Sequence, residues 1–188
     1  MKGGIIMPQV YTVFLSPSTQ FFNKYPSGSD EQDAMNRIAS LMEPLLINNG
    51  ISYSRNRPDT STARSVELSN EGYYDLHVAL HSNASPPELT GKLRGVDIYY
   101  FEYSYYGKAA AELIAEELRE VYPVPDDVKA LPTRRLFELR RTNAPAVLCE
   151  LGYHDNLQDE EWILTSAPEI AEAIVKGICA YFGIPFKK

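Results

Sequence analysis

Three histidines are the first candidates for chemistry in this sequence, because the chain contains only His77, His81 and His154. Two of them stand at or just past the ends of predicted strands. Such sparing and selective placement favours a metal-binding or acid–base role. His81 closes the strand-like segment 74–81, and we weigh this role above the alternative of a loop histidine bonded to Asn83.

His77 precedes His81 by four residues on the same predicted strand. A strand rises about 3.3 Å per residue, so the two backbones stand roughly 13 Å apart. Two imidazoles at that separation do not readily share one ion. We therefore expect His77 to be a buried structural residue or to support a ligand rather than to bind a metal itself.

Two glutamates are further candidates. Glu150 lies inside the apolar run 146–151, where an unpartnered carboxylate would be costly to desolvate. Two interpretations stay open: a salt bridge to Arg140 or Arg141, or a general base beside a metal-bound water. Glu31 falls in the first turn of a predicted helix, where the helix dipole alone favours an acidic residue.

Strand-like and helix-like segments alternate along the chain and must position these side chains. Strands are expected at 10–15, 51–54, 74–81, 96–101, 136–140 and 146–151. Helices are expected after capping-box spacings at 29–32 and 166–169 and over 60–70 and 110–121, while the proline-rich stretch 122–132 is expected to be a connection. The pattern predicts a single α/β domain with a mostly parallel, mixed and twisted sheet of about six strands, covered by helices on both faces.

The composition is that of an ordinary globular protein with an acidic balance. The 188 residues include 25 Asp and Glu against 18 Lys and Arg, a net charge of -7, so nothing draws the chain onto nucleic acid or an anionic membrane. Two cysteines without a CxxC pair exclude a disulfide framework or a thiolate zinc site. No apolar run approaches the length of a membrane span, and the N-terminus shows no signal-peptide pattern.

Four segments, taken in order, resemble the zinc-dependent N-acetylmuramoyl-L-alanine amidases, the cell-wall hydrolases of bacteria and their phages. They are FLSPSTQ (14–20), SDEQDAMN (29–36), DLHVALHSNA (75–84) and APAVLCELGYHDN (144–156). The resemblance covers nearly the whole chain. It implies an amidase-like catalytic domain at 9–188, preceded by an N-terminal extension at 1–8.

The resemblance also implies roles for individual residues around one Zn²⁺ ion. By position, Glu31 and His81 match metal ligands, and Glu150 matches the catalytic glutamate. Asn83 matches a residue that shapes the loop of the site. Arg140 lies on the family's approach to the last strand and is expected to position the substrate or Glu150.

One motif departs from the family. Where the family usually reads Asp-Pro-Gly-His-Gly, this chain has Ser-Pro-Ser-Thr-Gln at 16–20, similar to a variant branch that lacks the first zinc histidine. A catalytic zinc ion normally has three protein ligands and one open position. His154 is the preferred replacement ligand, with Thr19, His77 or water as alternatives. The opposing interpretation is that segment 153–156 simply begins and caps the next helix.

The resemblance implies hydrolysis of the amide between N-acetylmuramic acid and L-alanine, by zinc-activated water with Glu150 as general base. The expected partner is peptidoglycan or a muropeptide, bound by a monomer with no nucleic-acid or membrane partner. Without a signal peptide, the protein is expected to be made in the cytoplasm and to act after lysis, phage release or sporulation. Two alternatives stand: a degenerate muropeptide-binding or partner-binding domain, and a metal-independent acid–base pair of Glu150 and His154.

Overall fold

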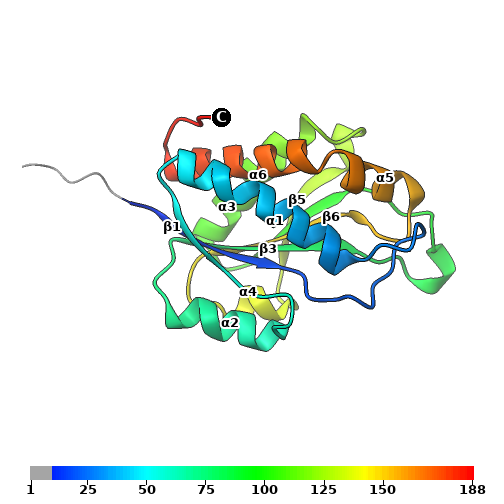
Figure 1. The fold of residues 1–188 in the computed structure, drawn as a ribbon, viewed down its shortest axis with the longest axis horizontal. Coiled ribbons are helices and arrows are strands. Elements are labelled where there is room, and N and C mark those ends of the chain that lie inside the picture. The colour runs from blue at the N-terminus through cyan, green and yellow to red at the C-terminus, as the bar shows by residue number, and fades with distance from the viewer. Residues whose placement is uncertain (1–9) are drawn as a thin grey trace, which may run out of the picture.

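A six-stranded mixed sheet lies at the centre of the computed structural model, which describes residues 10–188 (Figure 1). The strands are β1 (Thr12–Pro17), β2 (Ser52–Arg55), β3 (Leu76–Asn83), β4 (Val96–Phe101), β5 (Val128–Thr133) and β6 (Ala146–Tyr153), in the order β2-β1-β3-β6-β4-β5. β1, β2, β3 and β6 pair in parallel, whereas β4 runs antiparallel to β6 and carries β5 parallel to itself. The predicted fold class is confirmed, and the predicted extension at 1–8 lies outside the described residues.

Helices cover both faces of this sheet (Figure 1). One face carries α1 (Glu31–Asn48), α3 (Tyr105–Arg119), α5 (Leu157–Thr165) and α6 (Ala167–Phe182), and the other carries α2 (Thr62–Glu71) and α4 (Phe137–Arg141). Two short 3₁₀ helices, Pro87–Leu89 and Pro125–Asp127, lie in the connections. Within residues 10–188, no helix combines the length and apolarity that crossing a membrane requires.

The start of α1 places a carboxylate beside the ends of the parallel strands. Asp30 is the N-cap, and its side chain accepts a hydrogen bond of 2.9 Å from the backbone N–H of Asp33. Met35, Ile38 and Met42 are fully buried against the sheet at helical spacing. The predicted helix is therefore confirmed with Glu31 as its first residue, but its N-cap is Asp30 and not Ser29 of the expected capping box.

Two elements differ from the sequence-based prediction. The segment expected as a strand at 136–140 is the one-turn helix α4, because its adjacent residues Glu138 and Leu139 are both buried, which a strand with one exposed face does not allow. The expected connection at 122–132 contains most of β5. This strand lies at the edge of the sheet, where Pro132 removes no required hydrogen bond.

Close packing of α6 against α3 predicts that Gly177→Ala destabilises the fold. A Cβ atom at residue 177 would lie 2.6 Å from Ile114 Cα and 2.9 Å from Ile114 N. Overpacking against backbone costs about 1–3 kcal/mol, which outweighs the gain of roughly 1 kcal/mol in helix propensity. Urea unfolding should show a lower midpoint for this variant, while Ala180→Ser on the exposed face of α6 should leave it unchanged. Equal midpoints for Gly177→Ala and the wild type would contradict this packing.

Candidate active site

The carboxylate at the start of α1 meets the imidazole at the end of β3. Glu31 Oε1 lies 2.8 Å from His81 Nδ1, and the two side chains are only 1% and 13% exposed. Asn23 Nδ2 donates to Glu31 Oε2 at 2.7 Å, and the Gln20 amide lies 3.3 Å from His81 Nδ1. Tertiary structure thus joins two residues that the sequence singled out separately. In the loop after β1, the side chain that reaches His81 is Gln20 and not Thr19.

Glu150 stands beside this pair. β3 and β6 place His81 and Glu150 directly opposite each other in register, so their side chains leave the same face of the sheet. One carboxylate oxygen, Oε2, is buried without a hydrogen-bond partner. Burial raises the pKa of Glu150 to about 7, although the charge of His81 opposes this shift. Such a pKa suits a group that exchanges protons near neutral pH.

The salt-bridge interpretation of Glu150 finds no support in the structure. Arg140 and Arg141 are both exposed at the end of α4. Across the described residues, no lysine, arginine or histidine forms a salt bridge with Glu150. Neither arginine balances the charge of the Glu150 carboxylate. Arg140 makes no direct contact with Glu150, so the expected positioning of Glu150 by Arg140 is not observed.

A third carboxylate, which the sequence analysis did not single out, lies on the other side of the His81 ring. Glu138 Oε2 is 3.6 Å from His81 Nε2, beyond hydrogen-bond length but within ion-pair range. Glu138 Oε1 accepts a hydrogen bond of 2.7 Å from Ser16 Oγ and lies 3.9 Å from His77 Nε2. The only sequence signal was a glutamate between Phe137 and Leu139, in a segment predicted to be a strand.

Glu31, His81 and Glu138 shift one another's pKa values. Burial lowers the pKa of His81, but Glu138 and Glu31 outweigh this effect and raise it well above 6.5. Burial also raises the pKa of Glu31, and here His81 reverses the direction so that the pKa is lowered overall. Both ring nitrogens of His81 face carboxylates, which favour the charged form of the ring.

His154 lies against a different neighbour. Its ring packs on Tyr25 with 6.1 Å between centroids, and its Nδ1 is buried without a hydrogen-bond partner. Its backbone N–H donates to the carbonyl of Asn83 at 2.8 Å, while the Asn83 side chain accepts from the next backbone N–H. The Asn156 side chain caps α5 by accepting from the N–H groups of Gln158 and Asp159. Segment 153–156 therefore begins and caps the next helix, which was the alternative to a metal-binding role.

His77 is buried and structural, as its position predicted. The ring is completely inaccessible, Nδ1 contacts Ser69 Oγ at 3.0 Å, and burial lowers its pKa. It therefore lies beneath the site without joining the group around Glu31.

The donor set tests whether these residues fit a catalytic zinc ion. Glu31 and His81 contact each other, but among residues 10–188 no three His, Cys, Asp or Glu side chains gather where they could hold a metal ion. The expected ligand set of Glu31, His81 and His154 is not assembled. After the left-handed backbone of Gly152 (φ 79°), β6 ends and the His154 ring turns to Tyr25. The residues therefore do not fit a three-ligand zinc centre.

Comparison with known proteins identifies the family behind this arrangement. The sequence profile described as N-acetylmuramoyl-L-alanine amidase matches residues 22–180. The chain belongs to this amidase family. The resemblance found in the four sequence segments is thereby confirmed at the level of the family.

Two curated relatives of this amidase-family chain are longer proteins. It is 26% identical over 178 residues to a probable cell wall amidase LytH of Staphylococcus saprophyticus, covering 91% of this chain and 58% of the relative. It is 25% identical over 177 residues to an uncharacterized cell wall amidase of Bacillus anthracis, covering 86% and 32%. The chain thus spans about half the length, or less, of these curated relatives.

Solved structures share the fold. The N-acetylmuramoyl-L-alanine amidase of Clostridium difficile 630 superposes with a TM-score of 0.82 at 22% identity, covering 93% of this chain and 97% of that one. The amidase AmiC2 of Nostoc punctiforme gives 0.79 at 21% identity, with 92% and 97% covered. At these identities the likeness establishes the α/β architecture of the amidase-family chain.

Proposed function

We propose that this protein hydrolyses the amide between N-acetylmuramic acid and the L-alanine of the stem peptide, with Glu150 as the general base. One observation carries the assignment of the base: the Glu150 carboxyl lies beside His81, and its buried Oε2 has no partner within the protein. Membership of the amidase family supports the substrate class.

The unpartnered oxygen gives Glu150 a role in proton transfer. Oε2 can accept a hydrogen bond from a water molecule and take its proton as the water oxygen attacks the amide carbon. When the carbon–nitrogen bond breaks, the same carboxyl returns the proton to the leaving nitrogen, which gives a carboxylate and a free L-alanine amine. Only two of the three protein ligands of a catalytic zinc ion are present in the described part of the chain, so the proton transfer is assigned to Glu150 alone.

A second candidate function is binding of muropeptides without hydrolysis. It is favoured by the lost first histidine of the motif at 16–20 and by the engagement of both His81 nitrogens with Glu31 and Glu138. In this case the residues around Glu31, His81 and Glu150 would hold the wall fragment without activating water.

Digestion of purified peptidoglycan distinguishes the two functions. The hydrolase should release new N-terminal L-alanine amino groups, detected by amine labelling, without new reducing sugar ends. Sedimentation of the protein with peptidoglycan, in the absence of amine release, would instead support the binding function. New reducing ends alone would contradict both proposals, because they report cleavage between sugars.

The incomplete donor set predicts an activity that does not depend on bound zinc. Zinc analysis of the purified chain should give well below one ion per chain, because catalytic sites use three protein ligands. Amine release should survive treatment with EDTA within about twofold, a change too small to reflect the loss of an essential metal. Stoichiometric zinc together with a large loss of activity on chelation, restored by added zinc, would show that a third ligand joins Glu31 and His81.

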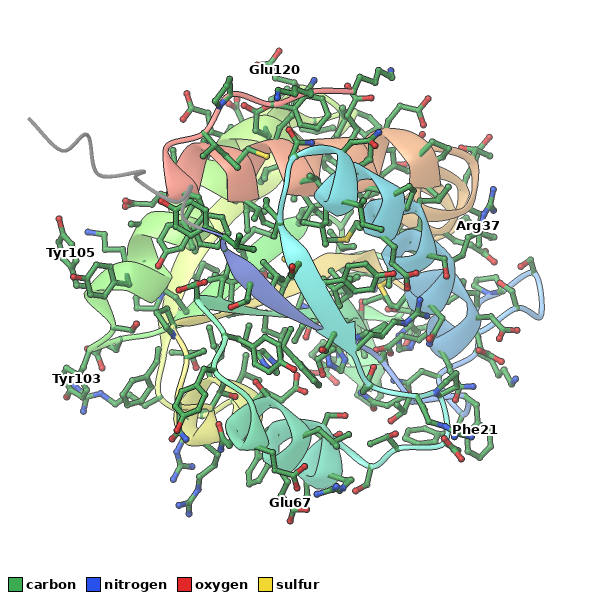
Figure 2. All side chains as sticks on the ribbon, turned by 60° about the vertical axis from the view of Figure 1, so that its left-hand side comes forward. Phe21, Arg37, Glu67, Tyr103, Tyr105 and Glu120 are labelled. Carbon is green, nitrogen blue, oxygen red and sulfur yellow. The ribbon has the colours of Figure 1, made fainter. Side chains whose placement is uncertain are left out.

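An exposed aromatic side chain offers a contact for the wall polymer. Phe21 is 61% exposed in the loop that carries Gln20, and Figure 2 shows it projecting from the molecule. Phe21→Ala is expected to raise KM about threefold to tenfold, the worth of one aromatic contact, with kcat unchanged. Tyr103 is 68% exposed and lies on the other side in this view, so Tyr103→Ala is the matched control. Equal KM values for the two variants would exclude the contact.

A further inference from the structure

We propose that Glu138 is a positioning residue that orients the His81 imidazole from the side opposite Glu31. The inference deepens the proposed function and rests on it for its kinetic part. Nothing in the four motifs of the sequence assigns a role to this glutamate, because α4 brings it to the site from outside them.

The geometry places the ring between two carboxylates. Glu31 Oε1 approaches Nδ1 at 2.8 Å, and Glu138 Oε2 approaches Nε2 at 3.6 Å. The two ring nitrogens lie on opposite sides of an imidazole, so the carboxylates constrain the ring from both ends. A ring flip would exchange a nitrogen for a carbon at each carboxylate, which would remove the hydrogen bond to Glu31 and weaken the attraction to Glu138.

The surroundings of Glu138 support a directed role rather than an incidental one. Its side chain is 3% exposed, and Oε2 has no hydrogen-bond partner within the described residues. A buried carboxylate without a partner is costly, and the His81 ring is the group that faces this oxygen, with Nε2 at 3.6 Å. His77, the other imidazole within 4 Å, faces the second oxygen of this carboxylate, Oε1, at 3.9 Å.

A second contact fixes the carboxylate itself. Ser16 Oγ donates to Glu138 Oε1 at 2.7 Å across 122 residues of sequence. Ser16 lies on β1, so its hydroxyl joins the first strand of the fold to α4. This hydrogen bond fixes one oxygen of Glu138 and leaves the other, Oε2, facing His81.

The imidazole nitrogens of His81 provide a direct readout of this role. Glu138→Gln keeps the volume of the side chain and removes its charge. In ¹⁵N-histidine-labelled protein, which has only three rings to assign, the Nε2 signal of His81 should shift while the signals of His154 stay in place. Glu160→Gln, another buried glutamate, which accepts from the Ser27 N–H, should leave His81 unchanged.

Kinetics give the second readout. Glu138→Gln should lower kcat about 10-fold to 100-fold with KM within twofold, because a misoriented ring affects the reaction rather than substrate binding. If Glu138→Gln fails to fold, Ser16→Ala, which frees Glu138 Oε1, should shift the same His81 signal. An unchanged His81 spectrum in the folded variants would overturn the proposal, even where the wild type hydrolyses peptidoglycan. If the variants shift the His81 signal but the wild-type protein has no amidase activity, only the proposed function is overturned.

Discussion

Glu150→Gln is expected to lower amine release from peptidoglycan by about 10²-fold to 10⁴-fold, the usual contribution of a general base. The amide keeps the volume of the carboxyl but cannot accept the proton of the attacking water. Initial rates of L-alanine amine release measure the effect. Glu161→Gln, on the exposed face of α5, should retain the wild-type rate.

The same variant makes a prediction for stability. Burial raises the pKa of Glu150 from 4.5 to about 7, so the folded state binds this proton more tightly than the unfolded state. The carboxylate therefore destabilises the fold increasingly as the pH rises from about 4.5 to about 7. Relative to the wild type, Glu150→Gln should gain stability between pH 5 and pH 8. Loss of both stability and activity at pH 8 would point to a structural role and contradict the assignment of a base.

Asp159→Ala is expected to cost roughly 3–5 kcal/mol of folding free energy, the largest effect we expect from a residue outside the site. Its carboxylate is completely buried at the start of α5. Oδ1 accepts 2.6 Å from the Tyr122 hydroxyl, and Oδ2 accepts from the backbone N–H groups of Gly95 at 3.0 Å and Tyr153 at 2.9 Å. Truncation leaves these three donors without an acceptor.

This aspartate also holds the end of β6. Its hydrogen bond to the Tyr153 N–H fixes the backbone directly after Gly152, which lies two residues beyond Glu150. Urea unfolding should therefore report the loss for Asp159→Ala, with Glu161→Ala on the exposed face of the same helix within about 0.5 kcal/mol of wild type. A loss below 1 kcal/mol for Asp159→Ala would show that water replaces the carboxylate.

Local pattern was enough for the elements that carry the site. The alternation in 74–81 and the apolar run at 146–151 predicted β3 and β6, and the polar start followed by apolar spacing predicted α1 with Glu31 in its first turn. These signals work because each element buries one face or both, and a strand or a helix repeats that face at its own period.

Short elements escaped the same reasoning. α4 has five residues, fewer than two turns, and β5 is a half-buried edge strand with a proline near its end. Neither shows enough repeats for a period to be recognised, so their existence depends on the sheet against which they pack.

The amino-acid sequence by itself determined the fold class, the family and three of the polar residues at the site, Glu31, His81 and Glu150. Only the tertiary structure decided their neighbours. It placed Glu138 beside His81 Nε2, Gln20 beside His81 Nδ1, and the His154 ring against Tyr25. The physical reason is that burial and periodicity act within one element and can be read along the chain. A contact such as Ser16 to Glu138, across 122 residues, exists only after separate elements have packed on the same sheet.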